Sequence, residues 1–245
     1  MDQDGTLILN GDDRFLKTVE ESCGFKRIFY GFGENCQYRA EDMCITKDGT
    51  EFTAVCGDKK VEVHLPVIGK HMVMNALAAM AAASVWGISM EEAAKALEGF
   101  SGCMNRQQIY EIRDYRVIDD TYNASPDSMK AALGVLYGME TAGKKIAVLA
   151  NMLELGDDSR KFHYEVGAYA GDVPPDVLIC IGELAEEIGR GLSENGDKST
   201  VIRSFAAKED ALPFLKEQIE KGDLILFKGS NSMKLGELIE ALKKE

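Results

Sequence analysis

This 245-residue sequence lacks the signatures of several specialised protein classes. Its six cysteines include no C-x-x-C pair and its three histidines do not stand at zinc-ligand spacing, so we expect reduced cysteines and no metal cluster. Basic residues number 28 against 41 acidic ones, which gives a net charge of −13. Because no basic stripe that could contact a phosphate backbone is present, we expect no nucleic-acid partner.

Long apolar runs are also missing. The longest, residues 76–86, is interrupted only by Ser84 and is too short to span a bilayer. The first four residues are acidic and polar, unlike a signal peptide. We therefore expect a cytoplasmic protein without a membrane span. A composition that is 45% hydrophobic and 28% charged is typical of a globular chain that buries its core without disulfides or metals.

The first hundred residues combine short strands, a meander and helices. Glycine-containing turns at Asp48-Gly49 and Gly57-Asp58 interrupt an alternation of apolar and polar positions, which predicts the meander. Ser89 and Glu92 have the spacing of a capping box, which predicts a helix start. The predicted elements are strands at 6–10 and 26–32, a helix at Phe15–Cys23, a meander over 36–65, and helices at 72–86 and 90–97.

From about residue 106, short apolar strands alternate with amphipathic helices. This α/β alternation predicts a mostly parallel, doubly wound sheet with helices on both faces, and the aperiodic segment 99–105 predicts a domain boundary near residue 105. The predicted strands are 107–112, 115–119, 145–149, 177–181, 200–204 and 224–227, and the helices are 127–137, 160–169, 183–193, 207–220 and 234–244. Ligands of such sheets bind at the carboxyl ends of strands, here near Asp119, Ala150, Gly182 and Lys228.

One segment imitates a phosphate-binding loop. Residues 138–145, GMETAGKK, nearly match G-x-x-x-x-G-K-[ST], but Lys145 replaces the hydroxyl that would hold magnesium. A helix precedes the segment and a strand follows it, the reverse of the order in which a helix N-terminus faces the phosphates. We therefore interpret it as a helix-to-strand turn. Gly31-Phe32-Gly33 lacks a third glycine and a following helix, so we assign it no function.

Three polar segments can carry chemistry, and each has a purely structural alternative. Asp119 and Asp120 can accept hydrogen bonds from ribose hydroxyls or orient a cation, or they can simply end a strand while Ser125 caps the next helix. Residues 69–75 can present polar side chains to a planar base or merely begin a helix. Residues 228–233 can bind a carboxylate or phosphate at the start of the last helix or merely cap it.

Taken together, these segments resemble the ATP-dependent Mur ligases. The matching segments, in chain order, are Asn10-Gly11-Asp12-Asp13, Gly69-Lys70-His71, Asn75–Ala79, Arg106-Gln107, Asp119–Met129, Met152–Gly156 and Lys228-Gly229-Ser230. The patterns D-D-T-Y-N-A-x-P-D-S-M and M-L-E-L-G are similar to the MurF branch, which joins D-alanyl-D-alanine to UDP-N-acetylmuramoyl-tripeptide in peptidoglycan precursor synthesis. The resemblance implies that residues 1–105 are the C-terminal part of the central ATP-binding domain and that residues 106–245 are the Rossmann-like last domain.

The resemblance also implies cofactors, partners and residue roles. The cofactors are ATP and Mg²⁺, and the partners are small molecules: ATP, UDP-MurNAc-tripeptide and D-alanyl-D-alanine. No segment matches the family's phosphate loop or its carbamylated-lysine segment, so we expect the magnesium ligands elsewhere and no ligation by this chain alone. The implied nucleotide-binding residues are His71 and Asn75 near adenine, Arg106 at the phosphates, and Asp119 or Asp120 at the ribose. The implied acceptor-binding residues are Asn123, Ser125, Lys228 and Ser230, and no catalytic residue is assigned.

Three positions depart from the family pattern. Met72, Asn151 and Asn231 stand where Asn, Asp and Arg are usual, and Met72 removes one potential hydrogen bond to adenine. Two other functions stay open. The chain could be a free-standing module that binds nucleotide or a D-alanyl peptide, or a ligase related to folylpolyglutamate or cyanophycin synthetases. The M-L-E-L-G and Y-N-A-x-P-D-S segments argue against this last possibility.

Overall fold

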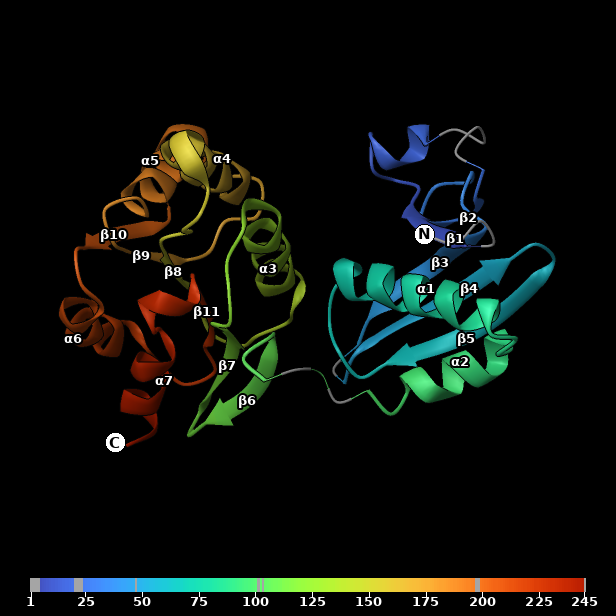
Figure 1. Ribbon diagram of the computed structural model, residues 1–245. Coiled ribbons are helices and arrows are strands. Elements are labelled where there is room, and N and C mark those ends of the chain that lie inside the picture. Colours follow the sequence, from blue (N-terminus) through green and yellow to red (C-terminus); the bar gives the residue numbers. More distant parts are fainter. Residues whose placement is uncertain are drawn as a thin grey trace. The chain divides into compact units, whose positions relative to one another are not determined.

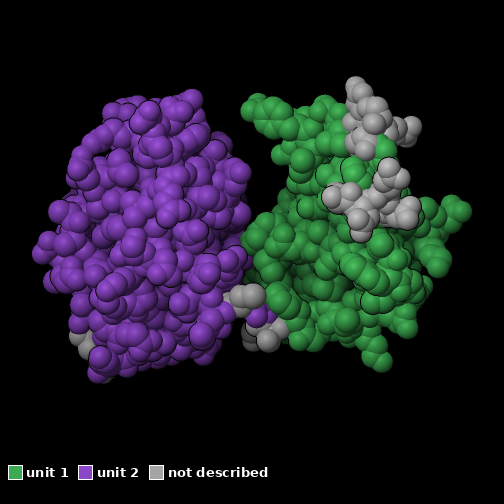
Figure 2. Space-filling model, in the orientation of Figure 1, with its two compact units in different colours: residues 1–101 green, residues 102–245 purple. Residues whose placement is uncertain are grey.

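The chain divides into two compact units. The computed structural model describes residues 5–19, 24–46, 48–100, 102, 104–196 and 199–244. Contacts between residues separate unit 1, residues 1–101, from unit 2, residues 102–245 (Figure 2). Each unit has its own sheet and its own buried core. The division falls just before residue 105, where the loss of periodicity predicts a domain boundary.

Unit 1 is a five-stranded sheet with two helices packed on one face (Figure 1). The strands lie in the order β1-β2-β3-β4-β5; β1, β2 and β3 are parallel, and the predicted meander β3-β4-β5 is antiparallel. The bounds are β1 Thr6–Asn10, β2 Lys26–Gly31, β3 Tyr38–Ile45, β4 Thr50–Cys56, β5 Lys59–Leu65, α1 Lys70–Val85 and α2 Met90–Leu97.

The helices of unit 1 form where their sequences favour them. Val73, Leu77 and Met80 recur at helical spacing and are buried against the sheet, which places α1 on the core. Ser89 and Glu92 form the predicted capping box at the start of α2, because the Ser89 hydroxyl accepts from the Glu92 N–H and the Glu92 carboxylate accepts from the Ser89 N–H.

The helix predicted at Phe15–Cys23 is wrong over its described part. Only a 3-10 turn, η1 (Leu16–Thr18), forms there, and the backbone of Val19 is extended. The Asp13 carboxylate accepts hydrogen bonds of 2.8 Å from the N–H groups of both Phe15 and Leu16. Such local side-chain bonds stabilise a turn in competition with a helix. Residues 20–23 lie outside the described residues.

Unit 2 is the predicted Rossmann-like α/β domain. Its six strands lie in the order β10-β9-β8-β11-β7-β6, and each neighbouring pair is parallel except β6 with β7. The strands are β6 Gln108–Ile112, β7 Tyr115–Asp120, β8 Lys145–Ala150, β9 Val177–Ile181, β10 Val201–Phe205 and β11 Leu224–Lys228. The helices are α3 Pro126–Gly138, α4 Ser159–Ala170, α5 Glu186–Asn195, α6 Lys208–Gln218 and α7 Gly236–Lys243, with 3-10 turns η3 Gly156–Asp158 and η4 Asn231–Met233.

Helices cover both faces of this sheet, as predicted. Along β8, Ile146 and Val148 belong to the core cluster that includes residues of α6 and α7, whereas Ala147 and Leu149 alternate with them and are equally buried. α3 contacts β8 and β11, and α5 contacts β9 and β10. The segment GMETAGKK is a helix-to-strand turn, because α3 ends at Gly138 and β8 begins at Lys145.

The start of the last helix differs from the prediction. α7 begins at Gly236 rather than at Lys234, and the 3-10 turn η4 and a left-handed Lys234 (φ 51°) separate it from Lys228-Gly229-Ser230. The interpretation that this segment opens the last α-helix is therefore wrong, because Ser230 precedes the 3-10 turn instead. Among the described helices, none combines the length and the apolar content needed to cross a membrane.

Candidate functional site at the carboxyl edge of the unit 2 sheet

Three of the segments that resemble the Mur ligases, those at Asp119–Met129, Met152–Gly156 and Lys228-Gly229-Ser230, meet at one edge of the unit 2 sheet. β11 lies between β8 and β7, so the carboxyl ends of these parallel strands are neighbours. The segments that follow them begin at Thr121 after β7, Asn151 after β8 and Gly229 after β11. This is the edge at which ligands bind to open parallel sheets.

A buried ion pair joins two of these strand ends. Lys228 and Asp120 are register partners on β11 and β7, and the Lys228 Nζ lies 2.7 Å from the Asp120 Oδ2. The same ammonium donates a 3.0 Å hydrogen bond to the backbone oxygen of Asn123. Lys228 is only 2% exposed. Its burial lowers the pKa of the ammonium; Asp120 partly offsets this effect, and the positive charge of Arg106 adds to it.

The two adjacent acids do not form a pair. Successive strand residues point to opposite faces, so Asp119 faces away from the side on which Asp120 meets Lys228. The Asp119 Oδ1 accepts hydrogen bonds from the hydroxyl of Thr121 at 2.7 Å and from its N–H at 3.2 Å. The two carboxylates therefore have separate surroundings, and Thr121 is a partner to which the sequence patterns assigned no role.

The residues after β7 have local structural partners. Ser125 is the N-cap of α3 and forms a reciprocal capping box with Ser128. The Asn123 side-chain oxygen accepts a 2.8 Å hydrogen bond from the Ala124 N–H. Both residues are exposed. The capping interpretation of Ser125 is thus confirmed, and an acceptor-binding role for either residue stays a prediction.

The segment after β8 is tied to the segment after β11. The Ser230 hydroxyl accepts a 2.9 Å hydrogen bond from the Leu153 N–H, and the Ser230 N–H donates to the Asn151 oxygen at 3.1 Å. The Asn151 side-chain oxygen accepts from the Ala185 N–H at 2.8 Å. The M-L-E-L-G and K-G-S segments are therefore adjacent in space, which sequence order alone does not reveal.

Arg106 lies at the surface of the same unit. Its guanidinium is stacked over the Tyr122 ring, 4.3 Å from the centroid, and the Tyr122 N–H donates to the Asn105 oxygen. These contacts link the beginning of unit 2 to the segment that follows β7. Arg106 is exposed, and its positive charge contributes to the lowered pKa of the buried Lys228.

His71 and Asn75 lie in unit 1, one turn apart on the first part of α1. Nearby, the Lys70 Nζ lies 4.5 Å from the centroid of the Phe32 ring. The Asp12 carboxylate accepts hydrogen bonds from the N–H groups of Phe32, at 2.7 Å, and Gly33, at 2.9 Å. The glycine-containing turn therefore binds a carboxylate of the chain itself, and the Asn-Gly-Asp-Asp motif after β1 was the available signal for Asp12.

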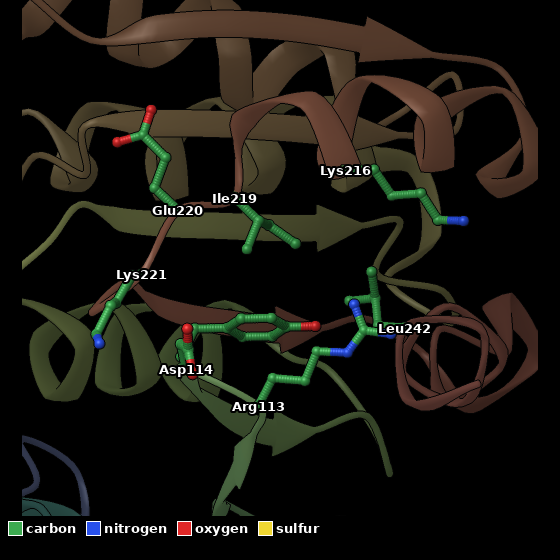
Figure 3. A pocket seen from close by; sticks show the side chains of 8 residues that line it. Arg113, Asp114, Lys216, Ile219, Glu220, Lys221 and Leu242 are labelled. Carbon is green, nitrogen blue, oxygen red and sulfur yellow. The ribbon is translucent and has the colours of Figure 1, made fainter. Parts of the chain in front are cut away.

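A cavity of about 220 Å³ lies at the opposite, amino end of β7 (Figure 3). Figure 3 shows the Arg113 side chain extending toward Leu242. The cavity is lined by Arg113, Asp114, Tyr115, Lys216, Ile219, Glu220, Lys221 and Leu242. None of the sequence-predicted site residues lines it. Within the described residues, no three His, Cys, Asp or Glu side chains are grouped so that they could hold a metal ion.

Family models and known proteins match nearly the whole chain. Residues 105–231 match the model described as Mur ligase, glutamate ligase domain, and residues 1–83 match the Mur ligase middle domain. The chain is 40% identical to the UDP-N-acetylmuramoyl-tripeptide–D-alanyl-D-alanine ligase of Bacillus subtilis, covering 98% of this chain and 51% of that protein. It is 30% identical to the enzyme of the same name from Haemophilus influenzae, covering 98% and 52%.

Solved structures agree with the sequence matches. A crystal structure of MurF from Acinetobacter baumannii superposes with a TM-score of 0.88 at 29% identity, covering 99% of this chain and 52% of that one. The chain spans about half the length of the curated relatives it matches.

Proposed function

The chain belongs to the Mur ligase family, and on that premise we propose that it forms part of an ATP-dependent amide ligase that adds D-alanyl-D-alanine to UDP-N-acetylmuramoyl-tripeptide. The observation that carries the proposal is the convergence of the three family-type segments at one sheet edge. Lys228 meets Asp120 there, and Ser230 meets Leu153. The 40% identity to the Bacillus subtilis ligase over 98% of this chain supports the same substrate pair.

We further propose separate tasks for the two units. In unit 1, His71 and Asn75 contact adenine from one face of α1. In unit 2, Arg106 contacts the phosphates of ATP, and Asp119 or Asp120 contacts the ribose. The exposure of Arg106 supports its role, since its guanidinium lies at the surface. Asp120 already has an ammonium partner, which favours Asp119 as the ribose ligand.

The acceptor dipeptide would bind near Lys228, Ser230, Asn123 and Ser125. In the reaction that family membership implies, the tripeptide carboxylate takes the γ-phosphoryl group of ATP and the amine of the dipeptide then displaces phosphate. ATP and Mg²⁺ are the implied cofactors, and we assign no magnesium ligand to the described residues. The part we assign to this chain is positioning and charge: Arg106 places positive charge where negative charge develops, and the Lys228–Asp120 pair fixes the edge at which the acceptor binds.

Calorimetry with ATP, and separately with D-alanyl-D-alanine, tests the binding roles in the purified chain. We expect Arg106→Ala to weaken ATP binding, because it removes a cation that contacts phosphate. Arg190→Ala is the matched control, since Arg190 is also exposed and stacked on a tyrosine, Tyr164, at 5.1 Å. Equal loss of ATP affinity in the two variants would contradict the role of Arg106.

A ligation assay tests whether the chain acts alone. We expect no ATP-dependent ligation, because no segment matches the family's phosphate loop, and loss of even one donor to a transition state costs ~3 kcal/mol. Ligation by the purified chain would refute this expectation. Absence of heat with both ligands at millimolar concentration would refute the binding roles, including those of a free-standing binding module.

A further inference from the structure

The segment Asn151–Leu155 after β8 is held by groups that come from three other parts of unit 2. The Asn151 N–H donates to the Ile181 oxygen on β9, the Met152 N–H to the His163 Nε2 on α4, and the Leu153 N–H to the Ser230 hydroxyl after β11. The next residue, Glu154, is exposed and has left-handed backbone (φ 65°). Left-handed conformations of non-glycine residues persist where the surroundings over-determine them, and they cluster at functional sites.

The contacts of His163 define its protonation state. His163 is 0% exposed; its Nε2 lies 2.8 Å from the Met152 nitrogen and its Nδ1 lies 2.6 Å from the Ser159 oxygen. A backbone N–H can only donate and a carbonyl oxygen can only accept, so Nε2 is unprotonated and Nδ1 carries the proton. Burial lowers the pKa of His163, which keeps the ring in this neutral form.

Few charges act on this ring. Glu187 on α5 is the acid whose charge acts on His163, and it is itself paired with Arg160 of α4 at 3.3 Å and with Arg190 at 2.8 Å. The ring is therefore not held by a carboxylate of its own. The hydrogen bond to the Ser159 oxygen, inside the first turn of α4, orients the ring. The hydrogen bond from the Met152 N–H then ties the segment after β8 to α4.

We propose that His163 is a positioning residue for the carboxyl-edge site. Its neutral imidazole and the Ser230 hydroxyl hold adjacent N–H groups, at Met152 and Leu153, and thereby fix Glu154 in its left-handed conformation at the edge. The ring itself touches no ligand. The inference rests on the proposed function only in that it takes this edge as the acceptor-binding edge.

Two single substitutions separate the two hydrogen bonds of the ring. His163→Gln places an amide oxygen near the Nε2 position and keeps an acceptor for the Met152 N–H. His163→Asn places its amide near the Nδ1 position and leaves that N–H without an acceptor. Because Asn is also one methylene shorter than Gln, exchange at the amides of β9 serves as the measure of general packing loss, and a difference confined to Met152 and Leu153 reports the Met152 hydrogen bond.

The decisive measurement is amide hydrogen exchange in the full chain. We expect His163→Asn to speed exchange at Met152 and Leu153 by roughly 10- to 100-fold, the factor expected when a buried donor loses its acceptor. His163→Gln should restore slow exchange, and the amides of β9 should change little in either variant. In the unsubstituted chain, nitrogen NMR should find the proton on Nδ1. Equal exchange in the two variants, or a uniform increase across unit 2, would overturn the proposal.

Titration with D-alanyl-D-alanine separates this inference from the proposed function. If the edge binds the dipeptide, His163→Asn should lower its affinity and His163→Gln should retain it. Binding that is equal in both variants despite faster loop exchange would overturn the positioning role. If the unsubstituted chain binds no dipeptide, the acceptor assignment is refuted, and hydrogen exchange still decides whether His163 fixes the loop.

Discussion

Lys228 connects two strand ends through one ammonium group. Its Nζ contacts the Asp120 carboxylate at 2.7 Å and the Asn123 oxygen at 3.0 Å while only 2% of the residue is exposed. Burying two charges is costly, and their attraction offsets that cost only when both partners are present. The ion pair therefore fixes the relative positions of the ends of β7 and β11 at this edge.

Lys228→Met should destabilise unit 2 strongly, because it leaves the Asp120 carboxylate buried without its ammonium partner. We expect a loss of about 3–5 kcal/mol in the free energy of unfolding, measured by urea denaturation. The double variant Lys228→Met/Asp120→Asn should recover much of the loss, since it removes the orphaned charge. The exposed Lys161→Met is the control and should change stability little. A loss as small as that of the control would contradict the account of the pair.

The pKa of His163 has a consequence for stability against pH. Burial lowers this pKa in the folded chain, whereas the unfolded imidazole titrates near its ordinary value of 6.5. As the pH falls below that value, the imidazole of the unfolded state binds a proton, whereas the buried imidazole of the folded state does not. The stability present above pH ~6.5 is therefore lost at up to ~1.4 kcal/mol per pH unit until the folded pKa is reached.

Denaturation of the native chain and of His163→Gln between about pH 7.5 and 5 measures this effect. The native chain should lose more stability on acidification than the variant. His163→Asn, which also removes the ionisable ring, should lose as little stability on acidification as His163→Gln. Parallel curves for the native chain and His163→Gln would show that the buried ring does not resist protonation.

At the scale of elements, α4 and α5 approach each other closely because a glycine of each helix faces the backbone of the other. A Cβ added to Gly167 of α4 would lie 2.0 Å from the Ile188 oxygen, and one added to Gly191 of α5 would lie 2.3 Å from the Tyr164 oxygen. Backbone cannot rotate away as a side chain can. The two helices therefore depend on these glycines for their packing distance.

Gly167→Ala should lower the free energy of unfolding by about 1–3 kcal/mol, because the helices must separate to admit the methyl group. Gly134→Ala, inside α3, is the matched control. Its Cβ would meet only the Tyr169 hydroxyl at 3.4 Å, so the better helix propensity of alanine should add roughly 0.5–1 kcal/mol. Thermal unfolding of both variants, with shifts of opposite sign, would support the close approach; stabilisation by Gly167→Ala would exclude it.

Most elements could be predicted from sequence because their patterns are strong. The apolar runs of β8 and β9 and the capping boxes at Ser89 and Ser125 lead to the observed elements within one or two residues. The failures come from local hydrogen bonds that periodicity does not encode. Asp13 favours a turn over the predicted helix, and the left-handed Lys234 delays the last helix by two residues.

The site was only partly predictable for a related reason. Strand ends and polar residues in the sequence indicated the edge at which these segments meet, but not which partners each side chain would take. Because side chains alternate along a strand, Asp119 and Asp120 point to opposite faces of the sheet. The placement of β11 beside β7 brings Lys228 next to Asp120, and the two form an ion pair. His163 gave no signal, since an isolated histidine in a helix has no spacing to interpret.

At the scale of the molecule, each unit buries its own core. The unit 2 core joins strand residues such as Val148 and Phe227 to helix residues such as Leu215 and Leu238, while the unit 1 core packs α1 and α2 on their own sheet. Separate cores are the property that lets domains fold separately.

A chain limited to residues 102–245 should therefore fold without unit 1. We expect a single cooperative unfolding transition by calorimetry and slow amide exchange along β8, β9 and β11. The full chain serves as the reference for the same amides. Non-cooperative melting, or fast exchange in these strands, would mean that unit 1 is required for the fold of unit 2.

The position of β11 sets the order in which unit 2 can be completed. This strand follows the other described strands of unit 2 in sequence, yet it lies between β8 and β7 at the middle of the sheet. While the protein is being made, β7 and β8 leave the ribosome with the gap between them empty and their facing edges unpaired. The sheet of unit 2 therefore cannot be completed until Leu224–Lys228 has emerged, and the facing edges of β7 and β8 stay open to aggregation until then.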